Sequence, residues 1–433
     1  MARTLIGDTP GRVGDKVMIK GWVHVVRDHG KLTFADVYDR SGMIQMVLKS
    51  GEKVGPQDAI ELEGEVKKRP DSMVNDKIPT GEVEIEVSNL KVISKSQELP
   101  FDMGADDLNL AINTLLDNRS LTLKHLRQRA IFEIESTLSN AFGEFLAGQG
   151  FVRIHTPKIV AAATEGGANL FEVKYFERKA FLAQSPQFYK QIGAGAFERV
   201  FEIGPVFRAE EHDTARHVNE YTSLDLEMSF IDSMQDLMDM ERDFLKFAFE
   251  KISEKNALQV KLLDVQIPTV ADVIPQIKLA DAQAMLKKEY GRDVVGEPDL
   301  DPEDERKVSE YFKEKEGSDF VFVTHYPRSK RPFYAMPDPD DPEMTVSFDL
   351  LFRGLEVTTG GERIHDYNML SDSIKSRGLD PKNFEYYLQA FAFGMPPEGG
   401  LAIGLERLTA RLLGIDNVRE TTLFPRDLSR LVP

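Results

Sequence analysis

The hydrophobic pattern of this chain changes its period near residue 126, and the change separates two parts that must be built differently. Before it, short β-branched or alternating runs are separated by Gly, Asp, Pro and Ser, as in strands joined by turns. After it, apolar residues recur on one face of a helix that ends near Gly148. The residues of that face are Ile131, Ile134, Leu138, Phe142 and Phe145. A chain of 433 residues is long enough for two or three domains.

The first part is predicted to contain five short strands. They cover residues 17–26, 32–38, 43–48, 59–66 and 83–93. Five strands in this length favour a small closed β-barrel of the OB-fold type, which often holds single-stranded nucleic acid. Strand count alone leaves a barrel without a ligand as an equal alternative. We place Trp22, which follows Gly21, in the barrel core.

The second part is predicted to be α+β. Strands are expected at 199–208, 222–230, 320–323, 346–358 and 401–403, and helices near 234–256, 280–289 and 383–394. Strands in runs with helices set apart favour a mainly antiparallel sheet over a doubly wound one. We therefore expect a barrel domain at 1–100, a linker at 101–125 and an α+β domain at 126–433.

The composition excludes several classes of protein. Apolar residues make up 41% and charged residues 29% of the chain, which is typical of a globular protein and not of a disordered one. No apolar run reaches the roughly 18 residues of a membrane span, and the N-terminus lacks a signal-peptide core, so we expect a cytoplasmic protein. Because the chain has no cysteine, disulfides and thiolate metal sites are excluded. The net charge of −18 neither supports nor excludes a local basic groove for nucleic acid.

Two polar clusters lie at the ends of predicted strands in the second part. The loop 208–220 can present cations to phosphates, for which arginine supplies a fixed fork of donors, although a solvated charged turn is the simpler alternative. Asp349 and Glu356 flank an apolar strand that ends in Thr359. Magnesium takes a few carboxylate oxygens together with substrate phosphates, but acidic residues at strand ends are also common without a metal. Their odd spacing places them on opposite faces unless a bulge intervenes.

Three further segments carry polar residues among apolar neighbours. These are 164–171 with Glu165, 184–191 with Gln187 and Lys190, and the glycine-rich 399–408 with Arg407. The last one leads into a helix, but its spacing matches neither a Rossmann fingerprint nor a P-loop. A helix N-terminus there can still favour an anion.

Taken in order, these segments resemble the motifs of the class II aminoacyl-tRNA synthetases. Residues 151–157 look like motif 1, residues 207–220 like motif 2 and residues 404–407 like motif 3. The barrel before the catalytic domain is similar to the subgroup for aspartate, asparagine and lysine, and the C-terminal 421–433 resembles archaeal-type aspartyl enzymes. The resemblance implies an ATP- and magnesium-dependent ligase. It also implies a cytoplasmic homodimer that activates L-aspartate and transfers it to tRNA(Asp).

The same resemblance implies roles for residues of the second part. Those implied to bind ATP are Arg208, Glu210, Arg216, His217, Val218, Glu356, Gly404, Leu405, Glu406 and Arg407, of which Arg208, Glu210 and Arg407 are catalytic. Those implied to bind aspartate are Glu165, Gln187, Lys190, Arg208, Thr359 and Arg363. Within that set, Lys190 and Arg363 would meet the side-chain carboxylate. Magnesium would be held by Glu356 and Thr359, with Asp349 nearby.

In the barrel, the resemblance implies an anticodon-binding face. Its residues would be Arg27, Phe34, Gln45 and Glu84. Selective relatives tend to carry a bulky aromatic in the first strand and a lysine before the last strand, where this chain has His24 and Pro79. Proline offers neither a side-chain donor nor a backbone N–H, so we expect charging of tRNA(Asn) as well as tRNA(Asp). The alternative is that His24 merely ends a strand and Pro79 merely stiffens a turn.

Other readings of the same motifs stay open. A discriminating aspartyl enzyme or an asparaginyl enzyme is the nearest alternative, and Lys190 favours aspartate because asparagine relatives tend to be apolar there. A lysine pocket would need an acidic partner in place of Arg363. A synthetase-derived amide-forming enzyme typically lacks the barrel, and an RNA-binding regulator should have lost Arg208, Glu356 or Arg407.

Overall fold

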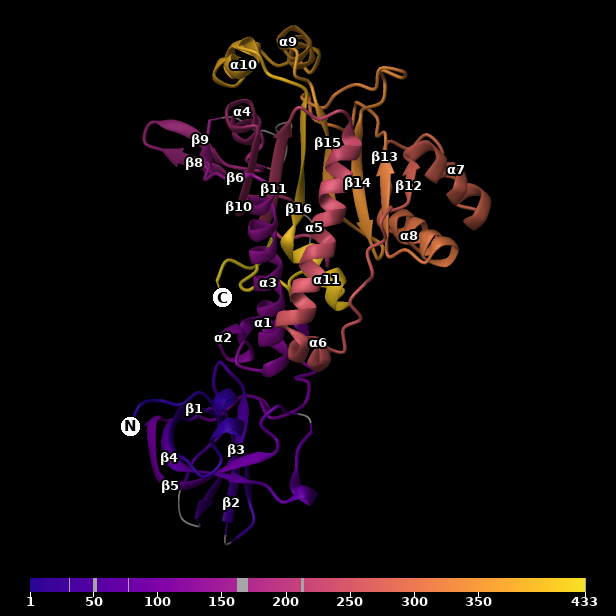
Figure 1. Cartoon of the computed structure of the whole chain (residues 1–433). Coiled ribbons are helices and arrows are strands. Elements are labelled where there is room, and N and C mark those ends of the chain that lie inside the picture. The colour runs from indigo at the N-terminus through magenta and orange to yellow at the C-terminus, as the bar shows by residue number, and fades with distance from the viewer. Residues whose placement is uncertain (31, 50–52, 77, 162–169, 212–213, 433) are drawn as a thin grey trace. The chain divides into compact units, whose positions relative to one another are not determined.

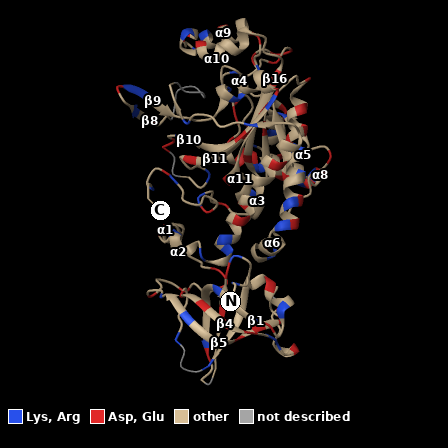
Figure 2. Cartoon of the chain, turned by 60° about the vertical axis from the view of Figure 1, so that its left-hand side comes forward, with Lys and Arg blue, Asp and Glu red and all other residues tan. Residues whose placement is uncertain are grey.

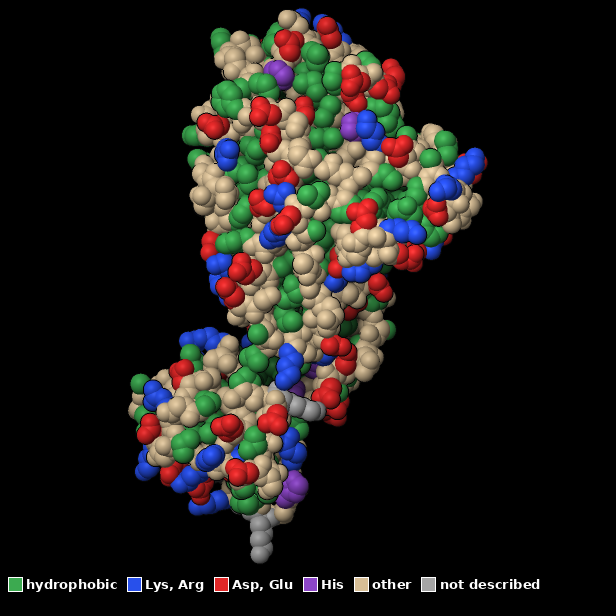
Figure 3. All heavy atoms as spheres, turned by 45° about the vertical axis from the view of Figure 1, so that its right-hand side comes forward, with side chains coloured by type: hydrophobic (Ala, Val, Ile, Leu, Met, Phe, Trp, Pro, Cys, Tyr) green, Lys and Arg blue, Asp and Glu red, His purple; other side chains and the backbone are tan. Residues whose placement is uncertain are grey.

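The computed structural model describes residues 1–433 except 31, 50–52, 77, 162–169, 212–213 and 433 (Figure 1). The chain divides into two compact units, Met1–Ala111 and Ile112–Pro433. On the face drawn in Figure 3, acidic and basic side chains are interspersed over both units.

The first unit is a closed five-stranded barrel with the strand order β1-β2-β3-β5-β4. Its strands are β1 (Lys16–Asp28), β2 (Leu32–Tyr38), β3 (Met43–Lys49), β4 (Ala59–Lys68) and β5 (Val83–Ser94), with the short 3₁₀ helices Ile6–Arg12 and Asp71–Met73. Alternate residues of each strand point inward, so that aliphatic side chains such as Ile19, Val37 and Leu62 fill the core. The predicted OB-type barrel and all five strands are confirmed.

Trp22 does not lie in the barrel core, so that prediction is wrong. Its neighbours Gly21 and Val23 take the inward positions of β1, and the alternation turns Trp22 outward with 39% of its surface exposed. There its ring stacks on Tyr38 at a centroid distance of 5.8 Å.

The second unit is built on an eight-stranded sheet with the order β12-β13-β14-β15-β16-β11-β10-β6. These strands are β6 (Val152–Arg153), β10 (Arg199–Phe207), β11 (Glu220–Ser229), β12 (Gln276–Lys278), β13 (Phe320–Thr324), β14 (Ser347–Phe352), β15 (Leu355–Arg363) and β16 (Glu398–Gly404). Among the described strands of this sheet, only the outer pairs β6–β10 and β12–β13 are parallel, which confirms a mainly antiparallel sheet. A separate three-stranded sheet consists of β7 (Ile159–Val160), β8 (Glu172–Tyr175) and β9 (Arg178–Leu182).

Two long helices cover one face of this sheet, as Figure 1 shows. They are α3 (Leu126–Gly148) and α5 (Met234–Lys255), and their aromatic side chains Phe142 and Phe244 pack edge to face against each other. The other helices are α1 (Ile112–Asp117), α2 (Arg119–Thr122), α4 (Gln187–Phe197), α6 (Ala257–Leu263), α7 (Leu279–Tyr290), α8 (Pro302–Glu316), α9 (Tyr367–Ser376), α10 (Glu385–Ala392), α11 (Leu405–Leu413) and the 3₁₀ helix Pro381–Phe384. In the described part of the chain, no helix has the length and apolar character that crossing a bilayer requires.

The predicted single strand 346–358 is in fact the hairpin β14–β15. The chain turns at Arg353 and Gly354, which both adopt positive φ, at 47° and 81°. The pattern did not reveal this turn because apolar residues flank it on both sides and are buried on both strands. Asp349 therefore pairs with Thr359 across the hairpin, and the two carboxylates lie on neighbouring strands.

The predicted linker 101–125 also differs from the structure, because its second half belongs to the second unit. Residues 112–122 form α1 and α2, and the guanidinium of Arg119 is almost completely buried. It donates to the backbone carbonyls of Glu420, Thr422 and Leu423 at 2.8–3.1 Å. These partners lie some 300 positions away, so local composition could not show that this segment is packed.

Candidate active site

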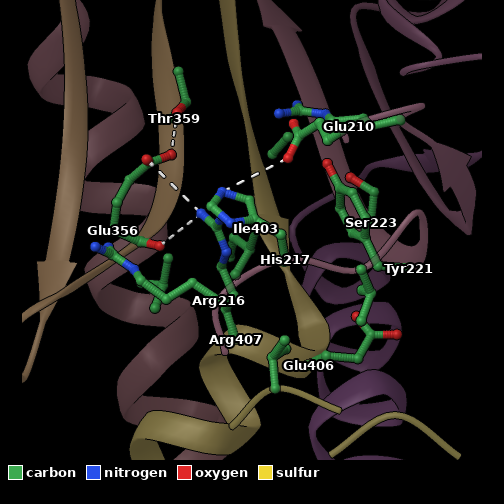
Figure 4. A pocket seen from close by; sticks show the side chains of 16 residues that line it. Glu210, Arg216, His217, Tyr221, Ser223, Glu356, Thr359, Ile403, Glu406 and Arg407 are labelled. Carbon is green, nitrogen blue, oxygen red and sulfur yellow. Dashed lines mark hydrogen bonds and ion pairs between the residues drawn. The ribbon is translucent and has the colours of Figure 1, made fainter. Parts of the chain in front are cut away.

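A pocket of about 650 Å³ opens on the sheet face where β10, β11, β15 and β16 meet the start of α11 (Figure 4). Charged and polar side chains line it, and they come from the predicted motifs 2 and 3 and from the strand that carries Glu356. They include Arg208, Glu210, His217, Glu356, Thr359 and Arg407. The structure thus brings together residues that are up to 199 positions apart in the sequence.

Arg208 follows the last residue of β10 and is fixed through its backbone. Its N–H donates to the carbonyl of Asn219 at 2.9 Å, and the Asn219 amide returns a hydrogen bond to the Arg208 carbonyl at 2.8 Å. The same amide donates to the carbonyl of Glu210 at 3.0 Å. The guanidinium lies over the ring of Tyr221. Asn219 therefore closes the base of this loop and determines where Arg208 enters the pocket.

Glu356 of β15 presents its carboxylate to the pocket, with 36% of the side chain exposed. Its Oε1 accepts from the hydroxyl of Thr359 at 3.0 Å, and its Oε2 lies 3.8 Å from the guanidinium of Arg407 (Figure 4). Burial opposes ionisation, but the charge of Arg407 and the Thr359 hydrogen bond together lower the pKa of Glu356. Glu356 is therefore an anion between cations.

Asp349 lies near Glu356 but is already engaged. It accepts from Arg331 at 2.8 Å, a residue that the sequence patterns did not single out. Burial raises the pKa of Asp349 to about 6, against the opposing charge of Arg331. No group of three or more His, Asp, Glu or Cys within the described ranges could hold a metal ion by itself. Glu356 and Thr359 offer one carboxylate and one hydroxyl, which suits a magnesium ion that takes its other ligands from water and phosphates.

The loop 216–218 reaches the pocket, yet its charged residues have partners within the protein. Arg216 forms an ion pair with Glu305 of α8, whose carboxylate also accepts from the Glu356 N–H at 2.9 Å. Burial raises the pKa of Glu305 to about 7, and Glu356 adds to the effect. His217 contacts Thr214 at 2.6 Å and Glu210 at 3.7 Å, while Val218 lines the wall.

Of the residues at the start of α11, some line the pocket and others do not. Gly404 and Arg407 line it, and Arg407 donates to the carbonyl of Glu356 at 3.2 Å. Glu406 lines the rim, but its carboxylate accepts from the Thr222 N–H at 2.9 and 3.1 Å and so ties α11 to β11. Leu405, which the sequence analysis placed among the ATP-binding residues, is not one of the residues that line the pocket. An apolar side chain at the first position of α11 turns into the hydrophobic core, where Leu405 is buried.

A second, larger cleft of about 2,510 Å³ continues from the first one. The two share Arg208, Tyr221, Ser223, Glu356, Thr359 and Ala402 as lining residues. Gln187, Lys190 and Arg363, which the sequence analysis assigned to aspartate binding, line the second cleft. The predicted Glu165 lies outside the described residues. Arg208 and Thr359 therefore stand where the two spaces join.

The cations of the second cleft are held by buried carboxylates. Lys190 Nζ lies 3.1 Å from both Asp225 and Glu227, and Arg363 Nε donates to Glu227 at 2.8 Å. Gln187 donates to the same Glu227 at 3.4 Å. Burial disfavours the charged form of Lys190, but Glu227 and Asp225 raise its pKa above the ordinary value.

Sequence reasoning missed Asp225 and Glu227, although a signal was present. They are two residues apart in the apolar run LDLEMSF, so both point to one face of β11. Two carboxylates on one face of a buried strand require cations, because an unpaired buried charge is very costly. This pattern could have been paired with Lys190 and Arg363.

On the barrel, the four predicted anticodon residues lie on one outer face. Asp36, Gln45 and Glu84 are direct neighbours across β2, β3 and β5. Arg27 binds Asp36 through two hydrogen bonds of 2.7 and 2.9 Å, and Gln45 donates to Glu84 at 2.9 Å. On the same face, Phe34 contacts the ring of His29. Asp36 and Arg69, which lies 3.7 Å from Glu84, were not predicted members of this face. Figure 2 shows both basic and acidic residues on the barrel.

His24 and Pro79 occupy different environments. His24 lies at a bulge in β1, is buried and packs its edge against Tyr38 at 6.2 Å. Pro79 is exposed in a turn closed by a hydrogen bond from the Gly81 N–H to the Ile78 carbonyl at 3.0 Å.

The chain matches known families over both units. Residues 111–428 match tRNA synthetases class II (D, K and N), and residues 17–93 match the OB-fold nucleic acid binding domain. The chain belongs to this family of class II aminoacyl-tRNA synthetases, and it is a ligase with an N-terminal OB-fold domain.

Named relatives of the chain are aspartate enzymes. It is 47% identical to the aspartate–tRNA(Asp/Asn) ligase of Deinococcus radiodurans, over 100% of this chain and 99% of the relative. It is 41% identical to the aspartate–tRNA(Asp) ligase of Pyrococcus abyssi, over 97% of each. The fold also matches the structure of asparaginyl-tRNA synthetase from Pyrococcus horikoshii complexed with asparaginyl-adenylate, with a TM-score of 0.91, 30% identity and full coverage of both chains.

Proposed function

We propose that this chain activates L-aspartate with ATP and transfers the aspartyl group to tRNA(Asp) and also to tRNA(Asn). The observation that carries the first part is the pair Lys190 and Arg363 in a cleft that joins the nucleotide pocket at Arg208. If these two cations bind the side-chain carboxylate of aspartate, its α-carboxylate can point toward Arg208.

The reaction has two steps. In the first, an oxygen of the aspartate α-carboxylate attacks the α-phosphorus of ATP, the bond to the bridging oxygen breaks, and pyrophosphate leaves. In the second, a hydroxyl of the terminal ribose of tRNA attacks the acyl carbon, and AMP leaves. Arg208 neutralises charge that develops at the α-phosphate, while Arg407 binds the distal phosphates. No protein nucleophile takes part, so rate enhancement comes from positioning and from electrostatic stabilisation.

We propose that the activation of aspartate requires magnesium, and the carboxylate of Glu356 in the nucleotide pocket supports this. Glu356, with Thr359, would hold the ion, and Asp349 would act from a distance because Arg331 already binds it. When bound, magnesium neutralises phosphate charge. Glu356 carries its negative charge at neutral pH because surrounding cations lower its pKa.

Aspartate is favoured over asparagine by the charge of the cleft. The fold is shared with an asparaginyl enzyme, so the fold itself does not decide. Asp225 and Glu227 already pair with Lys190 and Arg363, but both cations can only donate hydrogen bonds. A substrate carboxylate accepts at both oxygens, whereas the side-chain amide of asparagine would present an NH2 group to one of the donors. We also propose that the barrel face around Phe34 binds the anticodon, by stacking an aromatic ring on a base. The exposed Val152 of the edge strand β6 supports a homodimer, and a cytoplasmic location follows from the translation role.

A pyrophosphate-exchange assay tests the proposed activation. We expect labelled pyrophosphate to enter ATP when aspartate is present without tRNA, and a magnesium chelator to abolish the exchange. Each of the other amino acids serves as a control in the same assay. Exchange with asparagine or lysine in place of aspartate would show that the substrate is wrong.

The proposal for tRNA(Asn) rests on the two barrel residues at the discriminating places. The anticodons of tRNA(Asp) and tRNA(Asn) differ at one base, so discrimination needs a local contact. The buried His24 packs against Tyr38, and Pro79 supplies no donor. The relatives include ligases named for both tRNAs and ligases named for tRNA(Asp) alone, so either specificity is compatible with this family.

Charging of the two purified tRNAs tests this prediction. We expect the values of kcat/KM for tRNA(Asp) and tRNA(Asn) to agree within about tenfold, since one base contact is worth roughly 1–3 kcal/mol. A matched variant, Pro79→Lys, should lower charging of tRNA(Asn) more than that of tRNA(Asp). A preference of the unaltered protein for tRNA(Asp) by about a hundredfold or more would mean that another contact reads the base.

A further inference from the structure

Glu398 is a buried carboxyl group beside Arg363, one of the two cations that line the second cleft, and the proposed mechanism does not use it. It is the first residue of β16, pairs in register with Arg363 of β15 and Ser229 of β11, and has 1% of its surface exposed. Polar groups from four elements surround it. They are Gln191 of α4, Glu227 of β11, Arg363 of β15 and Tyr387 of α10.

A continuous chain of hydrogen bonds passes through Glu398. The Tyr387 hydroxyl donates to Gln191 Oε1 at 2.9 Å, and Gln191 Nε2 donates to Glu398 Oε1 at 2.6 Å. The carboxyl group of Glu398 is in turn hydrogen-bonded to that of Glu227. Glu227 is the carboxylate that holds both Arg363 and Lys190. The chain therefore connects α10 to the two cations of the cleft.

Two carboxyl groups can share a hydrogen bond only if one of them carries a proton. Glu227 has two cations as partners, so it stays ionised and the proton belongs to Glu398. Among the described residues, Oε2 of Glu398 and Oε2 of Glu227 are both buried without a hydrogen-bond donor, as expected if a proton on Glu398 is shared with Glu227. Burial, together with the charge of Glu227, raises the pKa of Glu398 well above its usual range.

The charge of the cleft depends on this proton. Lys190 and Arg363 balance Asp225 and Glu227, so the cluster is neutral while Glu398 is neutral. A third ionised carboxyl would make the cluster negative and would oppose a substrate carboxylate.

We propose that Glu398 is a positioning residue that, as a neutral acid, donates a hydrogen bond to Glu227 and thereby fixes Arg363 and Lys190 for the substrate's side-chain carboxylate. This inference rests on the proposed activation of aspartate. It assigns to Glu398 a part in the choice of aspartate over asparagine, because a tightly held Glu227 keeps the cations directed at a charged group.

Two substitutions separate the neutral acid from the ionised one. Glu398→Gln keeps a neutral donor to Glu227 and an acceptor for Gln191, so we expect the KM for aspartate in exchange to stay within about threefold. Glu398→Met has similar volume but no hydrogen bond. We expect it to raise the KM for aspartate about tenfold or more and to lower the preference for aspartate over asparagine, with the KM for ATP unchanged.

Glu241 supplies a matched control. It is a buried carboxyl of α5 that accepts from Thr358, lies outside both clefts, and has its pKa raised to about 8 by burial. Glu241→Gln and Glu241→Met should leave the KM for aspartate unchanged, and their melting temperatures show what the loss of a buried carboxyl costs the fold. Infrared difference spectra at neutral pH, unaltered protein minus Glu398→Gln, should show the carbonyl band of a protonated carboxyl group.

The outcomes are distinct. If Glu398→Gln weakens aspartate binding as much as Glu398→Met does, or if the infrared band is absent, an ionised Glu398 is required and the proposal is wrong. If both variants bind aspartate like the unaltered protein, Glu398 positions nothing. If the unaltered protein supports pyrophosphate exchange with another amino acid in place of aspartate, the proposed function is wrong. The effect of the Glu398 variants can then still be measured on the KM for that amino acid.

Discussion

Replacing Arg208 with alanine should abolish aspartate-dependent pyrophosphate exchange. Arg208 stands where the nucleotide pocket and the amino-acid cleft join, so its guanidinium reaches the α-phosphate that the substrate carboxylate attacks. Loss of one such preorganised donor costs roughly 3–4 kcal/mol of transition-state stabilisation, which is a factor of hundreds or more in rate. The hydrogen bonds between Arg208 and Asn219 use only the backbone of Arg208, so the loop should keep its shape when the Arg208 side chain is removed.

Arg199 provides the matched control for this experiment. It lies at the other end of β10, and its guanidinium donates to the carbonyl of Gln149 at 3.2 Å and stacks on Phe151. Arg199→Ala should retain exchange activity, and both variants should melt close to the unaltered protein. Near-normal exchange by the Arg208→Ala protein would refute the role of this loop in catalysis.

Much of the fold could be predicted because it depends on local pattern. Alternation of apolar and polar residues defines each barrel strand, and helical spacing defines α3. The errors arose where distant contacts override local pattern. Hydrogen bonds of Arg119 to distant carbonyls place the second half of the predicted linker in the second unit. The turn at Arg353 and Gly354 was not predicted because both strands that it joins are buried.

The candidate site shows the same division. The resemblance to the class II synthetases implied that Arg208, Glu356 and Arg407 act together, and in the structure all three line one pocket. The sequence could not show that Asp349 and Arg216 are already paired, because their partners Arg331 and Glu305 come from other parts of the chain. The pKa of a charged residue depends on those partners and on burial, and a local sequence motif indicates neither of them.

Lys190 illustrates this point and leads to the second large effect that we expect. Its ammonium group is buried and shared between Asp225 and Glu227, so it acts on the substrate as part of a cluster and not as an isolated cation. Lys190→Leu would leave two carboxylates with Arg363 as their remaining cation, in the place where an anionic side chain should bind. Removing one member of a buried charge pair costs on the order of 3–5 kcal/mol.

We therefore expect Lys190→Leu to reduce kcat/KM for aspartate in exchange by a factor of about 10² to 10⁴, with ATP binding unchanged. ATP affinity, measured by calorimetry, separates this loss from unfolding, because the nucleotide pocket does not include Lys190. Lys158→Leu is the matched control, since Lys158 also pairs with a buried glutamate, Glu202 at 2.9 Å, but lies outside both clefts. If the Lys190 variant binds ATP and still activates aspartate at the normal rate, the side-chain carboxylate is bound elsewhere. If it instead loses aspartate and gains asparagine, the excess of carboxylates at Asp225 and Glu227 selects a neutral amide, as the charge of the cleft requires.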